Sequence, residues 1–269
     1  MTIAQGKDDE LVSAQAVPPQ APKKGSGYFA YQSSRQVKEK RAIAKYVVKK
    51  IIEDGMSIFL DAGSTVHQVG LTLFNDTTIS GLMIMTNNML VFNEFTTRSK
   101  EMSDLGNVLA LAGGVYNQNH EALFGQTAEQ ALKSFNPQVV VIGASGFMVK
   151  EMIPDQLDHQ GAFHHDLVSE IVTKKAIVAM RTLHRVIVCD YRKIGVWDAS
   201  CFATIQELND KTEQCTIVTS IVPPELDDSQ KKRYEERYRE TRNALKKLAQ
   251  STHGSIKLLR VDYNGEEEA

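Results

Sequence analysis

Short apolar runs recur along the middle of the chain and alternate with segments whose apolar residues have helical spacing. The apolar runs are Ile58–Leu60, Met83–Met85, Val108–Leu111, Val139–Ile142, Val186–Cys189 and Thr216–Val222. The helical segments between them are Thr65–Phe74, Met89–Thr97, Thr127–Ser134 and Leu167–Arg181. Strands that are apolar throughout and alternate with helices are typical of a sheet buried on both faces. The sequence therefore predicts an α/β fold, with a mostly parallel sheet and helices on both faces.

The segments that flank this pattern differ from it. Residues 1–27 are rich in Ala, Gln, Lys, Gly and Pro without periodicity, so we expect residues 1–33 to be a disordered tail. From Ser34 a helical pattern begins, with Ile43, Val47 and Ile51 on one face. Its lysines and arginines fit a solvated helix face better than a phosphate contact. We therefore place one domain over residues 34–225.

Residues 226–269 form a third region, a charged helix followed by a tail. Residues 227–250 interleave both charge signs and carry a narrow apolar stripe that includes Tyr234, Tyr238 and Leu245. Such a stripe fits a helix docked on its own domain, or a contact between subunits. Interleaved glutamates argue against a nucleic-acid role for the arginines.

Composition narrows the function classes. The chain has 269 residues, 42% of them hydrophobic and 24% charged, and a net charge of −2. It is no polycation, so the overall charge gives no sign of nucleic-acid binding. Three scattered cysteines suit a reducing compartment, and no apolar run approaches the roughly 20 residues that span a bilayer. We expect a cytoplasmic protein with no membrane contact.

Small, polar or charged residues follow five consecutive predicted strands. One such end is an ordinary turn, but five in phase with the strands indicate a shared site, because ligands of parallel sheets bind beyond the carboxyl ends of the strands. Candidate ligand-binding residues at these ends are Asp61, Gly63, Ser64, Thr65, Thr86, Asn87, Gly113, Gly114, Asp190 and Lys193.

These side chains suit a polyhydroxylated anion. Carboxylates and amides bond hydroxyl groups, whereas a lysine and a helix N-terminus hold phosphate. Ser64 or Thr65 is expected to cap the helix after the first strand, and Gly63 lets a ligand approach the backbone.

Several motifs in this order resemble the sensor domain of DeoR-family transcriptional regulators. They include Asp61–Thr65, Thr86–Asn88, Ala112–Gly114, Ile142–Gly146, the helix with Glu170 and Lys174, and Asp190…Lys193…Gly195. The resemblance implies a fold related to ribose-5-phosphate isomerase and a phosphorylated sugar or related small anion as effector. It implies that Gly63, Ser64 and Thr65 hold phosphate, that Asp61, Asn87 and Lys193 line the sugar end, and that Glu170 belongs to the site.

The chain departs from the family pattern in two places. Family members place a winged helix-turn-helix before the sensor domain, whereas here we expect only a tail, which makes direct DNA binding doubtful. Between Gly146 and Glu170 this chain has a long segment that contains His159, His164 and His165. These histidines lack metal-ligand spacing, so no metal site and no cofactor are predicted.

Three functions compete on these residues. The favoured hypothesis is a sugar-phosphate sensor domain that acts in transcriptional or metabolic regulation, as a homo-oligomer and not as an enzyme. The alternative is a sugar-phosphate isomerase or deaminase, for which Asp61, Glu170 and Asp190 are the remaining candidate bases. The third hypothesis is a complete DNA-binding repressor, and the lack of a predicted helix-turn-helix argues against it.

Overall fold

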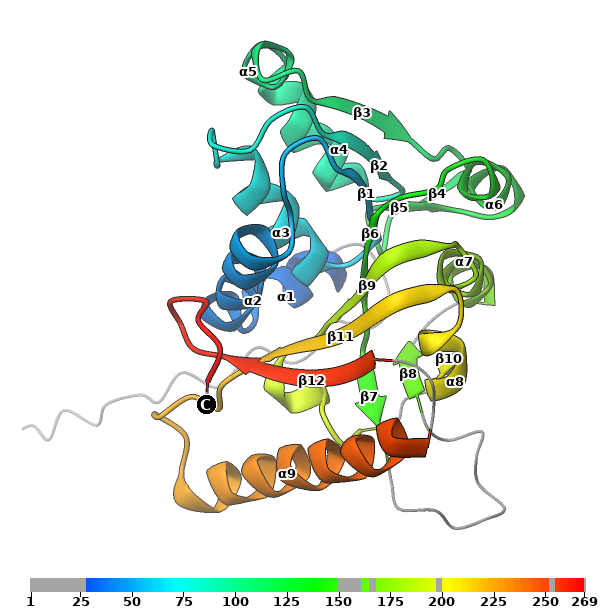
Figure 1. Ribbon diagram of the computed structural model, residues 1–269. Helices are drawn as coiled ribbons and strands as arrows, with labels where there is room; N and C mark the ends of the chain where they lie inside the picture. The colour runs from blue at the N-terminus through cyan, green and yellow to red at the C-terminus, as the bar shows by residue number, and fades with distance from the viewer. Residues whose placement is uncertain (1–27, 150–160, 165–167, 197–199, 252–254, 269) are drawn as a thin grey trace, which may run out of the picture.

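The computed structural model describes residues 28–149, 161–164, 168–196, 200–251 and 255–268. Seven strands form one sheet in the order β12-β11-β9-β6-β1-β2-β3, and every neighbouring pair is parallel. The strands are β1 (Ser57–Leu60), β2 (Met83–Thr86), β3 (Val108–Leu111), β6 (Val139–Gly143), β9 (Thr182–Val188), β11 (Thr212–Ser220) and β12 (Ser255–Val261). The predicted α/β class with a parallel sheet is confirmed (Figure 1).

Helices cover both faces of this sheet, as predicted. One face carries α2 (Val37–Lys50), α3 (Ser64–Phe74), α4 (Met89–Thr97) and α5 (Ser99–Asp104). The other carries α6 (Gln126–Lys133), α7 (Val168–Val178), α8 (Ile205–Asn209) and α9 (Asp228–Ser251). The short helix α1 (Tyr28–Ser34) contacts α3.

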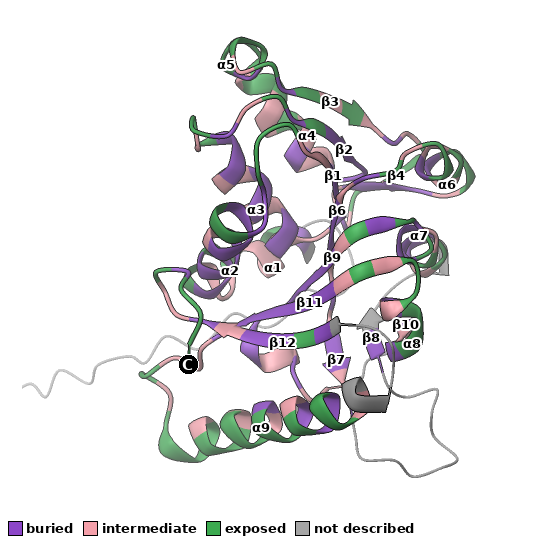
Figure 2. Ribbon diagram, viewed as in Figure 1, coloured by how far each residue is buried: buried purple, intermediate pink, exposed green. Residues whose placement is uncertain are grey.

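The strands are apolar throughout because they supply two cores at once. In β1, Phe59 belongs to the core under α6–α9, while Ile58 and Leu60 belong to the core under α2–α5. In β9, Ile187 belongs to the core under α6–α9 and Val186 belongs to the core under α2–α5. Successive side chains of a strand point to opposite faces, so a sheet that is covered twice needs apolar residues at every position. Figure 2 shows these central strands buried along most of their length.

The segment after α9 departs from the sequence analysis, which treated it as a tail. Residues Ser255–Val261 form β12, which pairs in parallel with β11 at the edge of the sheet. Ile256 and Leu258 join the core beneath α9, and Leu259 and Val261 join the opposite core. The alternation in this run was hidden by Lys257 and Arg260, whose long side chains reach the surface from a half-buried strand.

Helix α9 packs on its own domain, the first of the two arrangements predicted for it. Tyr238, Ala244 and Leu245 are buried in the core that includes Ile256 and Leu258. The outer surface of α9 is exposed and charged (Figure 2). Among the described residues, no helix is both long enough and apolar enough to cross a membrane.

Two small sheets stand at the carboxyl side of the main one. The hairpin of β4 (Val115–Asn117) and β5 (Ala122–Phe124) follows β3. Strands β7 (Gly146–Met148), β8 (Gly161–His164) and β10 (Ser200–Thr204) pair in the order β10-β8-β7. The segment predicted to border the site, residues 147–169, lies partly outside the described residues, and so do His159 and His165.

Candidate functional site

The predicted site residues gather at the carboxyl edge of the parallel sheet. Strands β9, β6, β1, β2 and β3 are consecutive neighbours, so the loops that follow them lie side by side. The loops after β1 and β6 touch: a Cβ at Gly143 would stand 3.0 Å from the carbonyl oxygen of Ala62. A glycine at this position lets the two loops close up, which places Asp61 next to the end of β6.

Asp61 forms a fully buried ion pair with Lys174 of α7. The ammonium Nζ of Lys174 donates to Asp61 Oδ2 and, at 2.9 Å, to the carbonyl oxygen of Gly143. Both side chains are 0% exposed. Oδ1 of Asp61 is also buried and has no hydrogen-bond partner in the described structure. A buried carboxylate oxygen without a donor is costly, so this atom is suited to accept from a ligand hydroxyl.

Asn87 presents a second buried acceptor of the same kind. Its Nδ2 donates to the carbonyl oxygen of Leu123 at 3.3 Å, and its own carbonyl oxygen accepts from the N–H of Leu123 at 2.8 Å. Its side-chain Oδ1 has no partner within the described ranges. The hairpin strand β5 therefore orients the amide and leaves its acceptor unused.

The neighbours of Asn87 brace the site rather than line it. Thr86 Oγ1 donates to the carbonyl oxygen of Leu60 at 2.6 Å and accepts from the N–H of Asn88 at 3.0 Å. Asn88 caps α4 by accepting from the N–H groups of Leu90 and Val91. Its Nδ2 donates to the carbonyl oxygen of Asp61 at 3.3 Å, which ties the loops after β1 and β2 together.

Helix α3 starts one residue earlier than the capping prediction required. Gly63 is its N-cap with φ 113°, and no side chain caps the helix, so the predicted cap by Ser64 or Thr65 was wrong. Both residues belong to the first turn, whose N–H groups have no partner inside a helix. A Cβ at Gly63 would meet no atom within 4 Å, so there is open space above this helix end. The end is suited to an anion.

The β4–β5 hairpin brings His120 to Glu170, one turn from Lys174 on α7. Nδ1 of His120 lies 3.3 Å from Oε2 of Glu170, and both side chains are buried. Gly114 permits this hairpin: its φ is 116°, and a Cβ would stand 2.6 Å from the carbonyl oxygen of Phe124. Gly113 also has a positive φ, 74°. The two glycines therefore shape the hairpin.

Asp190 and Lys193 form a separate cluster after β9, two strands from Asp61. Asp190 is fully buried; it accepts from Arg192 Nε at 3.0 Å and lies 3.9 Å from Lys193 Nζ. These cations lower the pKa of the Asp190 carboxyl, against the burial that raises it. The family resemblance implied that Lys193 lines the sugar end with Asp61 and Asn87, and the ion pair that the structure shows for Lys193 is with Asp190.

Lys40 of α2 is buried beside this cluster. It is 2% exposed and donates from Nζ to the carbonyl oxygen of Gln32. Burial, with the nearby charges of Lys193, Arg192 and Arg35, lowers its pKa to about 7, although Asp190 acts in the opposite direction. Three basic side chains, Lys193, Arg192 and Lys40, therefore lie near one buried carboxylate, which leaves an excess of positive charge suited to an anion. The sequence analysis assigned Lys40 to a solvated face, and that was wrong.

Three further side chains were missed as site residues: Lys174, His120 and Lys40. Lys174 follows Glu170 by four residues and so shares its helix face, which was a usable signal. Lys40 follows Glu39 among the many cations of an amphipathic helix, and His120 lies in a turn, so neither stood out by pattern. Among the described residues, no three His, Cys, Asp or Glu side chains gather as a metal ion would require.

The family model described as "DeoR C terminal sensor domain" matches residues 35–211. The chain belongs to this family. The glycerol-3-phosphate regulon repressor of Escherichia coli (strain K12) is 27% identical over 164 residues, which cover 61% of this chain and 57% of the relative. The lactose phosphotransferase system repressor of Staphylococcus epidermidis is 30% identical over 176 residues, covering 65% and 62%. The chain thus spans about three-fifths of these relatives.

Solved structures with some likeness include ribose 5-phosphate isomerases. The enzyme from Methanocaldococcus jannaschii has a TM-score of 0.36 and 16% identity, covering 57% of this chain and 52% of the enzyme. The enzyme from Plasmodium falciparum has a TM-score of 0.32 and 15% identity, covering 57% and 51%. The sheet topology already shows the fold, and similarity at TM-scores this low says nothing more about it. Nothing about activity follows from these similarities.

Proposed function

We propose that this chain is the effector-binding domain of a cytoplasmic transcriptional regulator and that its effector is a phosphorylated sugar. Membership of the sensor-domain family supports a regulatory role. Two relatives are named as repressors of a glycerol-3-phosphate regulon and of a lactose phosphotransferase system, which fits an effector from phosphorylated-carbohydrate metabolism. We further propose that the regulator is a homo-oligomer.

The observation that carries this proposal is the pair of unused buried acceptors at the sheet edge. Asp61 Oδ1 and Asn87 Oδ1 both lack a donor in the part of the chain that the structure describes. Water or a ligand with O–H groups satisfies such atoms, whereas an apolar or purely anionic ligand does not. Lys174 pairs with Oδ2 of Asp61 and leaves Oδ1 as the unused acceptor. A sugar that presents two hydroxyls matches this pattern.

The phosphate fits the positively charged parts of the same edge. The first turn of α3 offers backbone N–H groups behind the open space at Gly63. Lys193 after β9 and Lys40 on α2 supply positive charge, because Asp190 neutralises only one of the three basic side chains near it. A ligand whose hydroxyls meet Asp61 and whose phosphate meets these groups would join the two clusters and order the loops between them.

An isomerase on the same site is the second candidate. Glu170 and His120, 3.3 Å apart, are the kind of acid–base pair that proton transfer between sugar carbons needs. The relatives with which the chain aligns are repressors, which favours binding without turnover. Incubating the protein with a bound aldose phosphate and assaying for the ketose phosphate distinguishes the two functions.

A thermal-shift screen against phosphorylated sugars and their unphosphorylated parents tests the proposal. A ligand that binds only the native state at a hundredfold excess over its Kd stabilises it by about 2.7 kcal/mol. We expect at least one phosphosugar to raise Tm while its parent does not. Shifts from parents and phosphosugars alike would contradict the phosphate assignment, and no shift across the panel would overturn the sensor proposal.

Ser64→Asp sharpens this test because it places a negative charge at the N-terminus of α3. An acidic residue there stabilises the helix itself, so the fold is expected to persist while phosphate is repelled. Ser99→Asp is the matched control, since Ser99 is exposed and begins α5. We expect Ser64→Asp to abolish the phosphosugar shift and Ser99→Asp to leave it unchanged. Equal shifts in both variants would place the phosphate elsewhere.

A further inference from the structure

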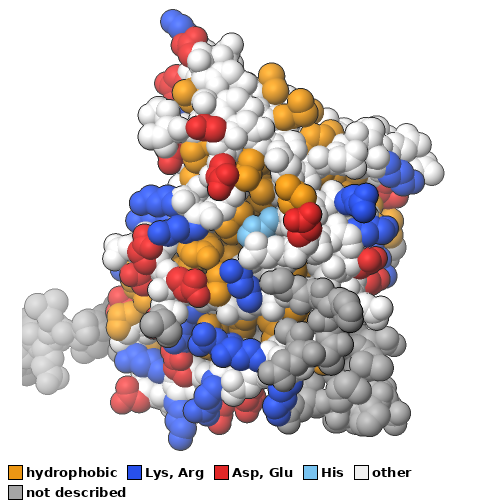
Figure 3. All heavy atoms as spheres, in the orientation of Figure 1, with side chains coloured by type: hydrophobic (Ala, Val, Ile, Leu, Met, Phe, Trp, Pro, Cys, Tyr) orange, Lys and Arg blue, Asp and Glu red, His pale blue; other side chains and the backbone are white. Residues whose placement is uncertain are grey.

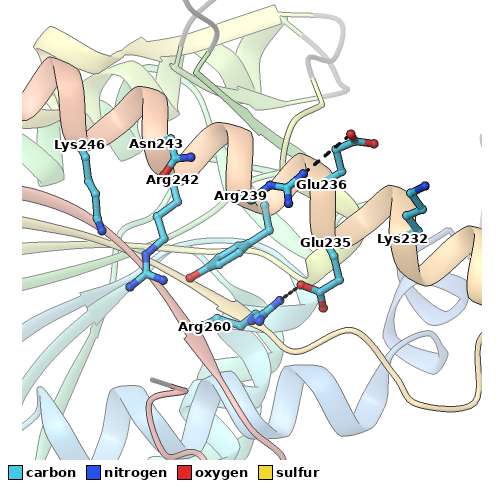
Figure 4. Close-up of a pocket in the computed structure, with 9 residues that line it drawn as sticks. Lys232, Glu235, Glu236, Arg239, Arg242, Asn243, Lys246 and Arg260 are labelled. Atoms are coloured by element: carbon cyan, nitrogen blue, oxygen red, sulfur yellow. Dashed lines mark hydrogen bonds and ion pairs between the residues drawn. The ribbon is translucent and has the colours of Figure 1, made fainter.

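A cationic groove runs between α9 and the sheet edge, outside residues 35–211 that match the sensor-domain family. Its volume is about 380 Å³, and Figure 4 shows the side chains along it. Five of the lining residues are cations and two are acids: Lys232, Arg239, Arg242, Lys246 and Arg260 against Glu235 and Glu236. Figure 3 shows such cations, with acids among them, along the face that α9 occupies.

The acids in the groove are already engaged. Glu235 pairs with Arg260 and Glu236 pairs with Arg239, while Arg260 also pairs with Glu268 from the end of the chain. Arg242 and Lys246 have no acidic partner within the described residues. Tyr238 forms the floor, with the guanidinium of Arg260 4.5 Å and that of Arg242 6.0 Å from its ring centroid. The groove therefore retains unneutralised positive charge beside Arg242 and Lys246.

The groove lies along a strand with a free side. β12 is the edge strand of the seven-stranded sheet, so its outer side has no neighbouring strand in the described structure. Strand N–H and C=O groups alternate between the two sides. The backbone of Arg260 faces the outer side of β12, because its carbonyl oxygen accepts from the N–H of Glu268 at 2.8 Å. Leu258 and Ile256, two and four residues earlier, therefore present their backbone groups to the same outer side.

The chain itself shows what such an edge binds. Residues 266–268 return antiparallel to β12, with a bridge between Val261 and Glu267, and the N–H of Asp262 donates to the carbonyl oxygen of Glu266 at 2.9 Å. Glu268 then places its carboxylate on Arg260. An acidic extended segment thus covers the carboxyl-terminal end of the β12 edge, and no strand of the described residues pairs with the rest of this edge, beside Arg242 and Lys246.

We propose that the open edge of β12 binds an acidic, extended segment of a partner protein as an additional antiparallel strand. Backbone hydrogen bonds to Ile256 and Leu258 supply the pairing, as in other cases of strand addition. Carboxylates on alternate residues of the partner meet Arg242 and Lys246, because alternate side chains of a strand share one face. The surface lies apart from the effector site, so it gives the domain a separate contact with its partner.

Fluorescence anisotropy with a labelled peptide of alternating glutamate and valine tests this proposal. We expect the peptide to bind the full chain, and the double variant Arg242→Glu/Lys246→Glu to weaken binding by about tenfold or more, since two attractions become repulsions. The matched control is Arg41→Glu/Lys49→Glu, which makes the same change in charge at two exposed residues of α2. This control is expected to bind as the parent does.

A second peptide separates strand pairing from simple charge attraction. N-methylation of alternate residues removes the backbone donors that face β12 and keeps every carboxylate, so it should weaken binding by a similar factor. Equal binding of the two peptides would overturn strand addition. Failure of the parent peptide to bind, or tighter binding of a DNA duplex that is lost in the Arg242→Glu/Lys246→Glu variant, would overturn the proposal as well.

Discussion

At the scale of single residues, the candidate site contains charged side chains that are buried and have few partners. Asp61 and Lys174 lose their hydration together and are fixed by one ion pair and one carbonyl oxygen. A buried pair adds little net stability, but removing one partner leaves an uncompensated buried charge. This asymmetry makes the pair a sensitive part of the site.

We expect Lys174→Met to lower the free energy of unfolding by about 3–5 kcal/mol, because Asp61 is left charged and buried. Asp61→Asn/Lys174→Met should lose less than the single change, since the orphaned charge is gone. Urea unfolding measures both. The control is Lys175→Met, an exposed neighbour on the same helix that should change stability by less than about 0.5 kcal/mol. Equal losses at both lysines would show that the ion pair is not the cause.

If the proposed phosphate site includes Lys40, phosphate binding depends on pH. Its pKa is lowered to about 7, so much of it is neutral above that pH in the free domain. A bound phosphate raises this pKa, and binding therefore takes up protons between pH 7 and the ordinary lysine value of 10.5. We expect the Kd of the phosphosugar to increase from pH 7 to pH 9, where the phosphate is already ionised.

Calorimetric titration in buffers of different ionisation enthalpy measures this proton uptake. The stability of the ligand-free domain depends on pH in the opposite sense. Between about pH 7 and 10.5 the unfolded chain holds more protons than the folded one, so stability rises with pH in this window. Lys40→Met should flatten both dependences. A pH dependence that persists in this variant would assign the proton to another group.

At the scale of elements, the site depends on how the β4–β5 hairpin folds back toward α7. His120 of the hairpin lies next to Glu170, and the backbone of Leu123 forms a hydrogen bond with Asn87. Its return relies on Gly114, where a positive φ and a close approach to Phe124 coincide. A single backbone position thereby orients two side chains of the site.

Gly114→Ala is expected to shift the hairpin and to cost about 1–3 kcal/mol of stability, because the added Cβ meets the carbonyl oxygen of Phe124. Effector affinity should fall with it. Gly125→Ala is the comparison: its φ is 97°, but a Cβ there meets no atom within 4 Å. Unfolding and binding measurements on both variants separate the clash from the strain in φ. An unaffected Gly114→Ala would remove the hairpin from the site.

At the scale of the whole molecule, one continuous parallel sheet joins the two surfaces for which we propose different partners. The effector edge lies beyond β9, β6, β1 and β2, whereas the groove beside α9 lies along the outer side of β12. Both rest on the core beneath α6–α9, which includes Phe59 of β1 and Leu258 of β12. The net charge of −2 conceals this arrangement, because the cations at each surface are balanced by acids elsewhere.

The sequence by itself determined six of the seven strands of the main sheet, in their order along the chain, and the residues that follow five of them. Apolar runs such as Val139–Ile142 fill both cores, so their pattern reports burial directly, and loops after parallel strands must share one edge. The tertiary structure decided which end residues meet. Lys174 reaches Asp61 across 113 residues of sequence, and Lys193 turns to Asp190. It also buried Lys40 and placed β12 at the sheet edge. These outcomes depend on contacts between distant segments, which the period of a local pattern does not contain.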